Sequence, residues 1–318
     1  MIRNAMPRCL VALAIAGATS ALGQQPAEPL SQAKSLLAAG KLAESEKALR
    51  NYLGSSPSSA DAHFLLGYVL FRSNKAKDSL AEFTEGAKFR PPQASELKIV
   101  ASDYVILSDY ADADKWFTAV IKETPDDPDA WYLLGRTKYN ENDFAAAISS
   151  FERALALHPR YVEAENNIGL SWKELNNPEN AQQAFQTAID WQGTAPADPH
   201  PFLNLGVILA DRNDFDKALP YLVKAAALSP ANPMIHERLG SVYASQQNLS
   251  KAQTELEQAV SLAPESSALH FKLGQMYRKQ GFTDRAQKEF DTCAKLNSTH
   301  SSTKTPNPFS MIRPEPQK

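Results

Sequence analysis

The sequence predicts an all-α fold in which pairs of helices are repeated along the chain. Glycine recurs at a spacing of 34 residues, with one step missing and one step stretched to 37. The glycines of this series are Gly67, Gly135, Gly169, Gly206, Gly240 and Gly274. At the missing step Ala101 stands where a glycine is expected. A period of this length is typical of paired helices rather than of strands or heptads.

The same residue types return at fixed distances from each glycine. The clearest copy starts at Pro128, and its repeated residues occupy positions 4, 7, 8, 12, 20, 24, 27 and 32. They are Trp131, Leu134, Gly135, Tyr139, Ala147, Phe151, Ala154 and Pro159. Apolar residues at spacings of three and four predict two amphipathic helices in each copy. Small residues at positions 8 and 20 let the two helices approach closely, and proline at position 32 ends the second helix.

This pattern resembles the tetratricopeptide repeat (TPR) family. The resemblance implies a right-handed superhelical solenoid of about eight helix–turn–helix copies within residues 24–300. We expect the copies near 26–59, 60–93, 94–127, 128–161, 162–195, 199–232, 233–266 and 267–300. Each copy buries its apolar face against its neighbours, so the array needs no single central core.

The two ends of the chain differ from the repeats. Residues 1–23 combine Arg3 and Arg8 with an apolar run and a small-residue cleavage site, which predicts a secretory signal peptide. Residues 301–318 are polar and proline-rich, and after Asn297 we expect no capping helix but a disordered tail. An alternative is that Phe309, Met311 and Ile312 fold back onto the last copy or bind a partner. The protein is therefore expected to be exported, either periplasmic or secreted.

Charge and hydropathy exclude two classes of partner. Loss of residues 1–23 would remove two of the 33 basic residues and none of the 36 acidic ones, leaving a net charge of 31 − 36 = −5. Because the basic residues form no cluster, we expect no nucleic-acid partner. No second hydrophobic stretch reaches membrane length, so stable membrane insertion is not expected.

No arrangement of residues predicts catalysis, a metal or a cofactor. The phosphate-loop, dinucleotide, zinc-protease and nucleophile-elbow motifs are absent from the sequence. His63, His236 and His270 occupy position 4, where other copies have Trp131 or Phe202, which indicates packing at joints between copies. Cys293 occupies position 27, where alanine is usual, and we expect a small buried thiol there.

Two irregularities are expected to set this chain apart from a uniform array. Residues 193–201 replace the usual connection between copies, and their three prolines favour a stiff offset over a flexible linker. Pro220 lies inside the second helix of the next copy, where it should remove a hydrogen bond to Asp216 and bend the helix.

The resemblance further implies a concave groove lined by positions 2, 5, 6, 9, 12 and 13 of each first helix. Aromatic, amide and arginine side chains at these positions suit an extended peptide, because amides pair with its backbone and rings cover its side chains. The candidate residues are Tyr68, Arg72, Tyr132, Arg136, Tyr139, Asn166, Asn167, Asn204, Arg238, Lys272 and Gln275.

Two known binding patterns of the family match only in part. Of the five residues of the carboxylate clamp of chaperone-tail-binding members, only Asn204 and Arg238 are present. Of the asparagine ladder of O-GlcNAc transferase, only Asn167 and Asn204 match. We therefore expect a non-catalytic scaffold for a protein or peptide of unknown identity. The alternatives are an obligate subunit or assembly factor of an envelope secretion, pilus or polysaccharide-export complex, and an enzyme with an unrecognised site.

Overall fold

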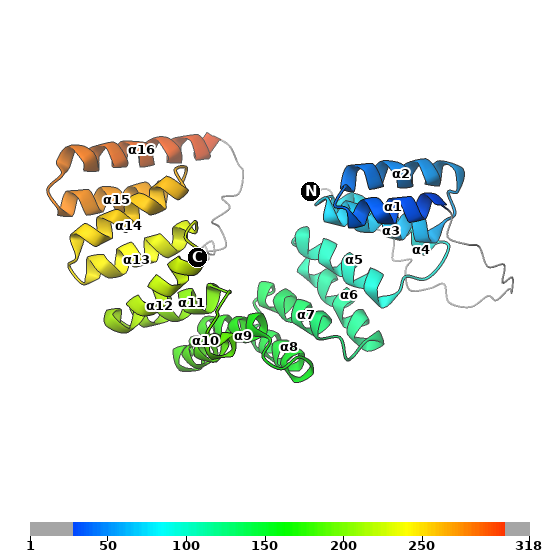
Figure 1. Cartoon of the computed structure of the whole chain (residues 1–318), viewed down its shortest axis with the longest axis horizontal. Helices are drawn as coiled ribbons and strands as arrows, with labels where there is room; N and C mark the ends of the chain where they lie inside the picture. Colours follow the sequence, from blue (N-terminus) through cyan, green and yellow to red (C-terminus); the bar gives the residue numbers. More distant parts are fainter. Residues whose placement is uncertain (1–27, 303–318) are drawn as a thin grey trace, which may run out of the picture. The chain divides into compact units, whose positions relative to one another are not determined.

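The computed structural model describes residues 28–302, which form sixteen α helices and no strand (Figure 1). The helices follow one another in pairs, and we call the first helix of each pair the A helix and the second the B helix. The chain divides into two compact units, residues 1–171 and 172–318, with the boundary inside α9. Each unit is described by itself. The predicted all-α repeat fold is confirmed.

Unit 1 holds four helix pairs and the first part of α9. The helices are α1 (Glu28–Ala38), α2 (Leu42–Ser55), α3 (Ala60–Arg72), α4 (Ala76–Ala87), α5 (Ala94–Ile106), α6 (Tyr110–Glu123), α7 (Pro128–Asn140), α8 (Phe144–Leu157) and α9 (Val162–Glu174). Within this unit each B helix from α2 to α6 also contacts the A helix that follows it, and α3 contacts α5 directly. The A helices α3 and α5 therefore lie side by side.

Unit 2 repeats this arrangement. Its helices after α9 are α10 (Pro178–Gln192), α11 (His200–Asp211), α12 (Phe215–Leu228), α13 (Pro233–Ser245), α14 (Leu249–Leu262), α15 (Ser267–Lys279) and α16 (Thr283–Ser302). A helices again meet, since α11 contacts α13, and a core of leucine, valine and tyrosine side chains runs from α11 to α16.

A residue with left-handed backbone geometry sits at position 15 of every pair. These residues are Gly40, Asn74, Ser108, Asn142, Asn176, Asn213, Gln247 and Gly281, with φ between 57° and 83°. Asparagine and glycine tolerate this conformation better than other residues. The next amide then bonds back to the A helix, as Lys75 N does to Leu70 O at 2.9 Å. This closes the A helix and sends the chain back along it.

The glycines at position 8 lie where each A helix crosses its own B helix. A Cβ added at Gly135 would come within 2.6 Å of the Phe151 ring, and one added at Gly240 within 2.8 Å of Leu256. The side chain opposite is the one at position 24 for Gly67, Gly135, Gly206, Gly240 and Gly274. Any larger side chain would have to push the two helices apart.

The connection between α10 and α11 is held by side-chain hydrogen bonds. The Gln192 side chain accepts from the amides of Ala197 and Asp198 and donates to the Asp198 carbonyl, at 2.8 to 3.2 Å. Asp198 in turn accepts from the His200 amide at 2.9 Å. These bonds support the stiff connection that the prolines predict. Pro220 is accommodated inside α12, which stays a single helix.

Two expectations at the C-terminal end need correction. Helix α16 continues past Asn297 to Ser302, because the first proline of the tail comes only at Pro306. Cys293 is half-buried rather than buried, since no helix pair follows α16 among the described residues to cover it. The predicted signal peptide at 1–23, and Phe309, Met311 and Ile312, lie outside the described residues.

Candidate binding surface

The least buried stripe of each A helix comprises positions 2, 6, 9 and 13, and we call it the open face. In α13, Met234 and Ser245 on this stripe are exposed, whereas Ile235, Leu239 and Val242 are buried. The spacing of four, three and four residues places the stripe on one side of the helix. The open face is therefore the surface that the A helices leave for a partner.

In unit 1 the open face of α3 carries an arginine stacked on a tyrosine. The Arg72 guanidinium lies 5.9 Å from the centre of the Tyr68 ring and donates to its hydroxyl at 3.2 Å. Phe71 stacks on Tyr68, with 6.4 Å between the ring centres. Arg72 is exposed and forms no ion pair with a carboxylate in the described part of the chain.

In α7 a tyrosine and an arginine are again four residues apart, but at positions 5 and 9 instead of 9 and 13, so only the arginine lies on the open face. Arg136 lies 5.9 Å from the centre of the Tyr132 ring, is exposed, and is likewise without an ion-paired carboxylate within residues 28–302. Tyr132 is fixed by Tyr161, whose ring is 4.9 Å away, and by the Asn167 amide, which donates to its hydroxyl at 3.3 Å. Asn167 also donates to the Glu163 carbonyl at 2.7 Å. We call the pairs 68/72 and 132/136 the two Tyr–Arg pairs.

Two further candidates of unit 1 are less available. Asn166 occupies position 5 and is only 7% exposed, because this position turns toward neighbouring helices instead of outward. Tyr139 is half-buried and meets the edge of Phe144 at 5.3 Å. Between the two Tyr–Arg pairs in chain order, α5 presents Ile106, which is 44% exposed.

In unit 2 a buried glutamate binds the predicted cations. Glu237 in α13 is 7% exposed and accepts a hydrogen bond from Lys272 of α15. Its other oxygen lies 3.3 Å from Arg238 Nε, and Ser241 donates to the carboxylate at 3.1 Å. Arg238 and Lys272 are thus brought together and share one carboxylate, which balances one of their two positive charges. Sequence reasoning missed Glu237, although an acidic residue beside Arg238 was a visible signal.

Two large apolar side chains are exposed on the A helices of unit 2, Met234 on the open face of α13 and Phe271 at position 5 of α15. Met234 is 43% exposed and Phe271 is 46% exposed, and Gln275 on α15 is exposed beside them in the repeat register. Asn204 on α11 is half-buried. The candidate residues therefore fall on two faces: unit 1 offers unneutralised arginines on aromatic rings, and unit 2 offers apolar side chains around an ion-paired cluster.

Asp103 is a buried carboxyl group that sequence reasoning also missed. It occupies position 10 of α5 and is fully buried, where other copies have Val69, Thr137 and Val242. Within the part of the chain that the structure describes, neither of its oxygens has a hydrogen-bond partner. Ser79 is the nearest polar group acting on it, but the Ser79 hydroxyl donates to the Gly67 carbonyl at 2.8 Å. Burial raises the pKa of Asp103 to about 7.

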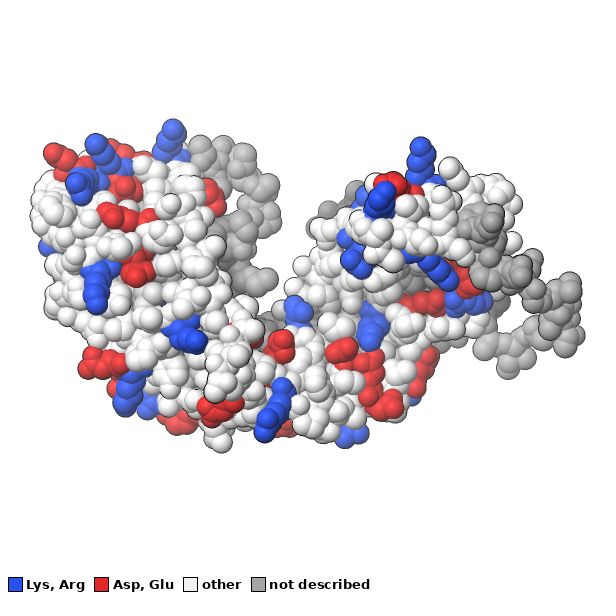
Figure 2. All heavy atoms as spheres, viewed as in Figure 1, with Lys and Arg blue, Asp and Glu red and all other residues white. Residues whose placement is uncertain are grey.

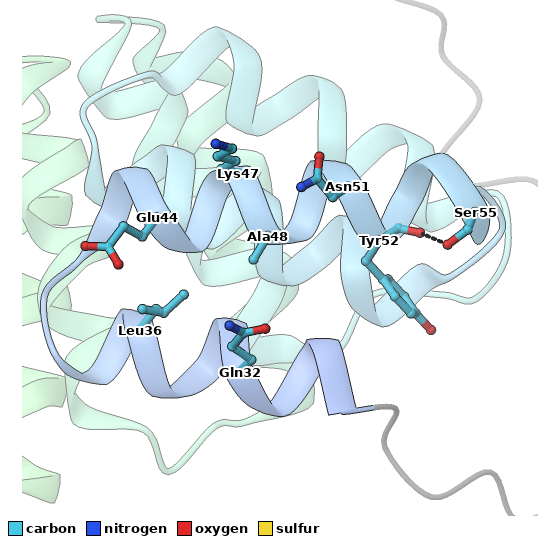
Figure 3. A pocket seen from close by; sticks show the side chains of 8 residues that line it. All are labelled: Gln32, Leu36, Glu44, Lys47, Ala48, Asn51, Tyr52 and Ser55. Atoms are coloured by element: carbon cyan, nitrogen blue, oxygen red, sulfur yellow. Dashed lines mark hydrogen bonds between the residues drawn. The ribbon is translucent and has the colours of Figure 1, made fainter.

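A groove of about 520 Å³ runs between α1 and α2 (Figure 3). Gln32 and Leu36 line it from α1, and Glu44, Lys47, Ala48, Asn51, Tyr52 and Ser55 line it from α2. Gln32 takes position 7, where Leu66 and Leu134 are buried in later copies. No described pair precedes α1, so this polar groove has the composition of a solvated end surface.

The described residues show neither a metal-binding cluster nor a membrane-spanning helix. Within residues 28–302, no three His, Cys, Asp or Glu side chains are grouped as metal ligands would be. No helix in that range is long and apolar enough to cross a membrane. On the face drawn in Figure 2, basic and acidic side chains both occur over each unit.

Comparison with known families agrees with this geometry. Tetratricopeptide repeat profiles match residues 30–94, 101–161, 132–199, 173–233 and 209–270. Together these matches span well over half of the chain, so the chain belongs to the tetratricopeptide repeat family. The resemblance inferred from the glycine spacing is confirmed.

Curated relatives match over part of their length. The peroxisomal targeting signal receptor of Saccharomyces cerevisiae is 25% identical over 230 residues, which cover 59% of this chain and 37% of the receptor. Protein FlbA of Caulobacter vibrioides is 30% identical over 122 residues, covering 38% of this chain and 20% of FlbA. The chain therefore spans well under half the length of these relatives.

Solved structures share the fold. A tetratricopeptide repeat protein from Parabacteroides merdae superimposes with a TM-score of 0.63 at 17% identity, covering 78% of this chain and 97% of its own. The type IV pilus biogenesis factor PilW gives a TM-score of 0.54 at 20% identity, covering 66% and 93%. At such identities the likeness extends to the fold alone.

Proposed function

We propose that the protein is a non-catalytic scaffold that binds an extended peptide segment of a partner protein on the open face of α3, α5 and α7. Membership of the tetratricopeptide repeat family supports a scaffold, since its members generally act through protein–protein contacts. The observation that carries the proposal is the presence of two Tyr–Arg pairs whose guanidinium groups have no carboxylate partner in the described chain.

The chemistry of this face indicates what the peptide contains. A guanidinium beside a tyrosine ring retains N–H groups that can bind a carboxylate, and contact with the ring limits the rotamers of the arginine before binding. The exposed Ile106 of α5 offers an apolar contact between the two pairs. The face therefore suits a segment that has two acidic side chains separated by an apolar one.

A peptide library displayed on phage and selected on the full chain tests this proposal. We expect enrichment of acidic residues that flank an apolar residue. The double substitution Arg72→Ala and Arg136→Ala should lower the affinity for a selected synthetic peptide at least tenfold, because two charge-assisted contacts are lost. Fluorescence anisotropy measures this affinity. Arg153→Ala is the matched control, because Arg153 is exposed on α8, a B helix of the same unit. Equal affinity of the double variant and the control would refute the proposal.

The obligate-subunit alternative is favoured by one observation in unit 2. Met234 and Phe271 leave large apolar side chains exposed on α13 and α15. An obligate subunit of an envelope complex would be unstable or insoluble when purified alone, whereas a scaffold for transient peptides would stay monodisperse. Size-exclusion chromatography of the purified chain, with and without Phe271→Ser, distinguishes the two.

We also propose that the protein is exported, on the basis of the charged start, apolar run and small-residue site in residues 1–23. Expression in a bacterial host should give a periplasmic product whose first residue is Gln24. Mass spectrometry of the intact protein checks this, and a cytosolic product that retains residues 1–23 would contradict it.

A further inference from the structure

Three joints between helix pairs contain the same histidine arrangement. The rings of His63, His236 and His270 occupy position 4 of α3, α13 and α15. In each ring, Nδ1 lies 2.5 to 2.7 Å from a carboxylate oxygen of the B helix of the same pair, from Glu82, Glu255 and Glu289. In each ring, Nε2 lies 2.9 Å from a proline carbonyl oxygen in the preceding connection, of Pro57, Pro230 and Pro264.

The two contacts of each ring require two protons. A backbone carbonyl and an ionised carboxylate can only accept hydrogen bonds. Neutral imidazole has one N–H, so it can donate to one of these oxygens while its other nitrogen turns a lone pair toward the second oxygen. The doubly protonated ring donates to both. Loss of one proton therefore removes one of the two links at the joint.

The copies of the repeat that lack this histidine provide a comparison for the arrangement. Position 4 is histidine only in the three copies in which position 23 is glutamate. The other copies have Ala48, Trp116, Ser150, Ala184 and Tyr221 at position 23. In the fourth copy Trp131 Nε1 donates to the Pro125 carbonyl at 2.9 Å, with Ser150 at position 23. Trp131 thus makes the same hydrogen bond to the preceding connection as the histidines do, but its indole N–H does not titrate.

The surroundings of the rings differ between the units. The His63, His236 and His270 side chains are 12%, 12% and 9% exposed, so little water replaces a lost bond. In unit 1, Arg50 of α2 lies 3.8 Å from Glu82, and Phe89 stacks 6.1 Å from the His63 ring.

In unit 2 the histidine is the cation that pairs with each glutamate. The charges of Glu255 and Glu289 help to raise the pKa of Tyr243 and of Tyr277, whose hydroxyl donates to Glu257, and Arg285 lies 5.8 Å from the centre of the Tyr277 ring. Within the described residues, no lysine or arginine forms an ion pair with either glutamate. Unit 1 therefore has a second cation at its glutamate, and the two joints of unit 2 depend on the histidine alone.

We propose that His63, His236 and His270 are protonated links between helix pairs, and that the joints before α3, α13 and α15 loosen when these rings lose a proton. The effect should be largest in unit 2, where two consecutive joints use the link and no lysine or arginine shares the carboxylate. Raising the pH would then loosen α13 and α15, the helices that carry the exposed Met234 and Phe271. A binding surface on a repeat array would thereby become sensitive to acidity without any titrating group on the surface itself.

Ring nitrogen NMR of the ¹⁵N-labelled full chain tests the protonation directly. Between pH 5 and 7 we expect both nitrogens of the three rings to carry protons. The exposed His158, whose ring centre lies 5.0 Å from that of Tyr161 and which has no glutamate contact of this kind among the described residues, serves as the reference ring. A single neutral tautomer in all three rings at pH 6 would overturn the proposal, whatever any variant does.

Hydrogen exchange tests the consequence for the joint. Exchange of the α13–α16 amides, corrected for the intrinsic rate, should accelerate about tenfold between pH 6 and pH 9 as charge-assisted bonds are lost. The double substitution His236→Trp and Glu255→Ser copies the fourth copy and should remove the pH dependence around α13. His158→Gln is the control and should keep it. An unchanged pH dependence in the double variant, or none in the wild type, would contradict the proposal.

Discussion

Asp103 in unit 1 and Glu237 in unit 2 are both buried carboxylates on A helices, and they are accommodated in opposite ways. Asp103 has no hydrogen-bond partner for either oxygen, and burial raises its pKa to about 7. Glu237 is bound by Lys272, Arg238 and Ser241. In unit 1 no hydrogen bond from a described residue offsets the desolvation of Asp103, and the exposed Arg72 and Arg136 stay available to a ligand. In unit 2 the carboxylate is stabilised by the very cations that would otherwise serve a ligand.

The largest expected effect comes from removing the unpaired carboxyl. Asp103→Val, which copies Val69 and Val242, should raise the free energy of unfolding by about 3 kcal/mol at pH 8. The folded-state pKa of about 7 exceeds the value of 3.8 for the unfolded chain. Between these values the folded state binds more protons, so wild-type stability falls as the pH rises, and the advantage of the variant grows.

Urea unfolding at pH 5 and pH 8 measures this difference. Thr137→Val is the matched control, because Thr137 occupies the same position and its hydroxyl does not titrate but bonds to Leu133 O at 2.9 Å. If the difference between Asp103→Val and the wild type were the same at both pH values, Asp103 would already be ionised in the folded protein.

A smaller loss of stability is expected from overpacking a helix crossing. Gly135→Leu must displace the Phe151 ring, which lies 2.6 Å from the site of the added Cβ, and should cost about 2 kcal/mol. Gly240→Leu in unit 2 should cost more, since the Ala252 carbonyl oxygen of the backbone is also only 3.3 Å away. Thermal unfolding by circular dichroism ranks the two. Gly54→Leu is the control, because its added Cβ would meet no atom within 4 Å.

Freeing the cations of unit 2 should make its surface more like that of unit 1. Glu237→Gln leaves Lys272 and Arg238 without their carboxylate, so we expect weak binding of an acidic peptide by unit 2 and a stability loss of about 1 kcal/mol. Titration calorimetry of the Arg72→Ala and Arg136→Ala background isolates this new binding. Glu257→Gln is the control, because Glu257 accepts from Tyr277 and Gln253 and pairs with no cation. If Glu237→Gln bound the acidic peptide no better than that control, Lys272 and Arg238 would not form a binding site even without their carboxylate.

The smallest effect is expected for the asparagines. Asn167→Ala and Asn204→Ala together should weaken peptide capture about threefold, the loss of roughly one hydrogen bond, with helicity and melting temperature unchanged. In unit 1 this follows from release of the Tyr132 hydroxyl, to which Asn167 donates. Each single variant measured by anisotropy shows which unit carries the effect. Unchanged capture by the double variant would exclude both amides from the surface.

Much of the fold follows from the sequence because the repeat tests each assignment several times. The glycine opposite position 24, the left-handed residue at position 15 and the prolines at position 32 are each repeated along the chain. The site was less predictable. Asn166 has the right register for a groove, yet it is buried, since small shifts of neighbouring helices decide which way position 5 turns.

The histidines show the same limit of sequence reasoning. Their shared position correctly indicates a joint between copies, but it gives no reason to expect the bonds to Glu82, Glu255 and Glu289. The partners are 19 residues apart in sequence and meet only because the A and B helices of one pair are antiparallel neighbours.

The sequence by itself determined the family, the helix pairs and the residues that close each turn, because these depend on local spacing and on backbone preference. Only the tertiary structure decided which charges are free. Arg72 and Arg136 stack on tyrosines, whereas Arg238 and Lys272 meet Glu237, and Asp103 meets no donor. The physical reason is that ionic and hydrogen-bond partners are selected by distances of a few ångströms between helices, which the repeat spacing does not specify.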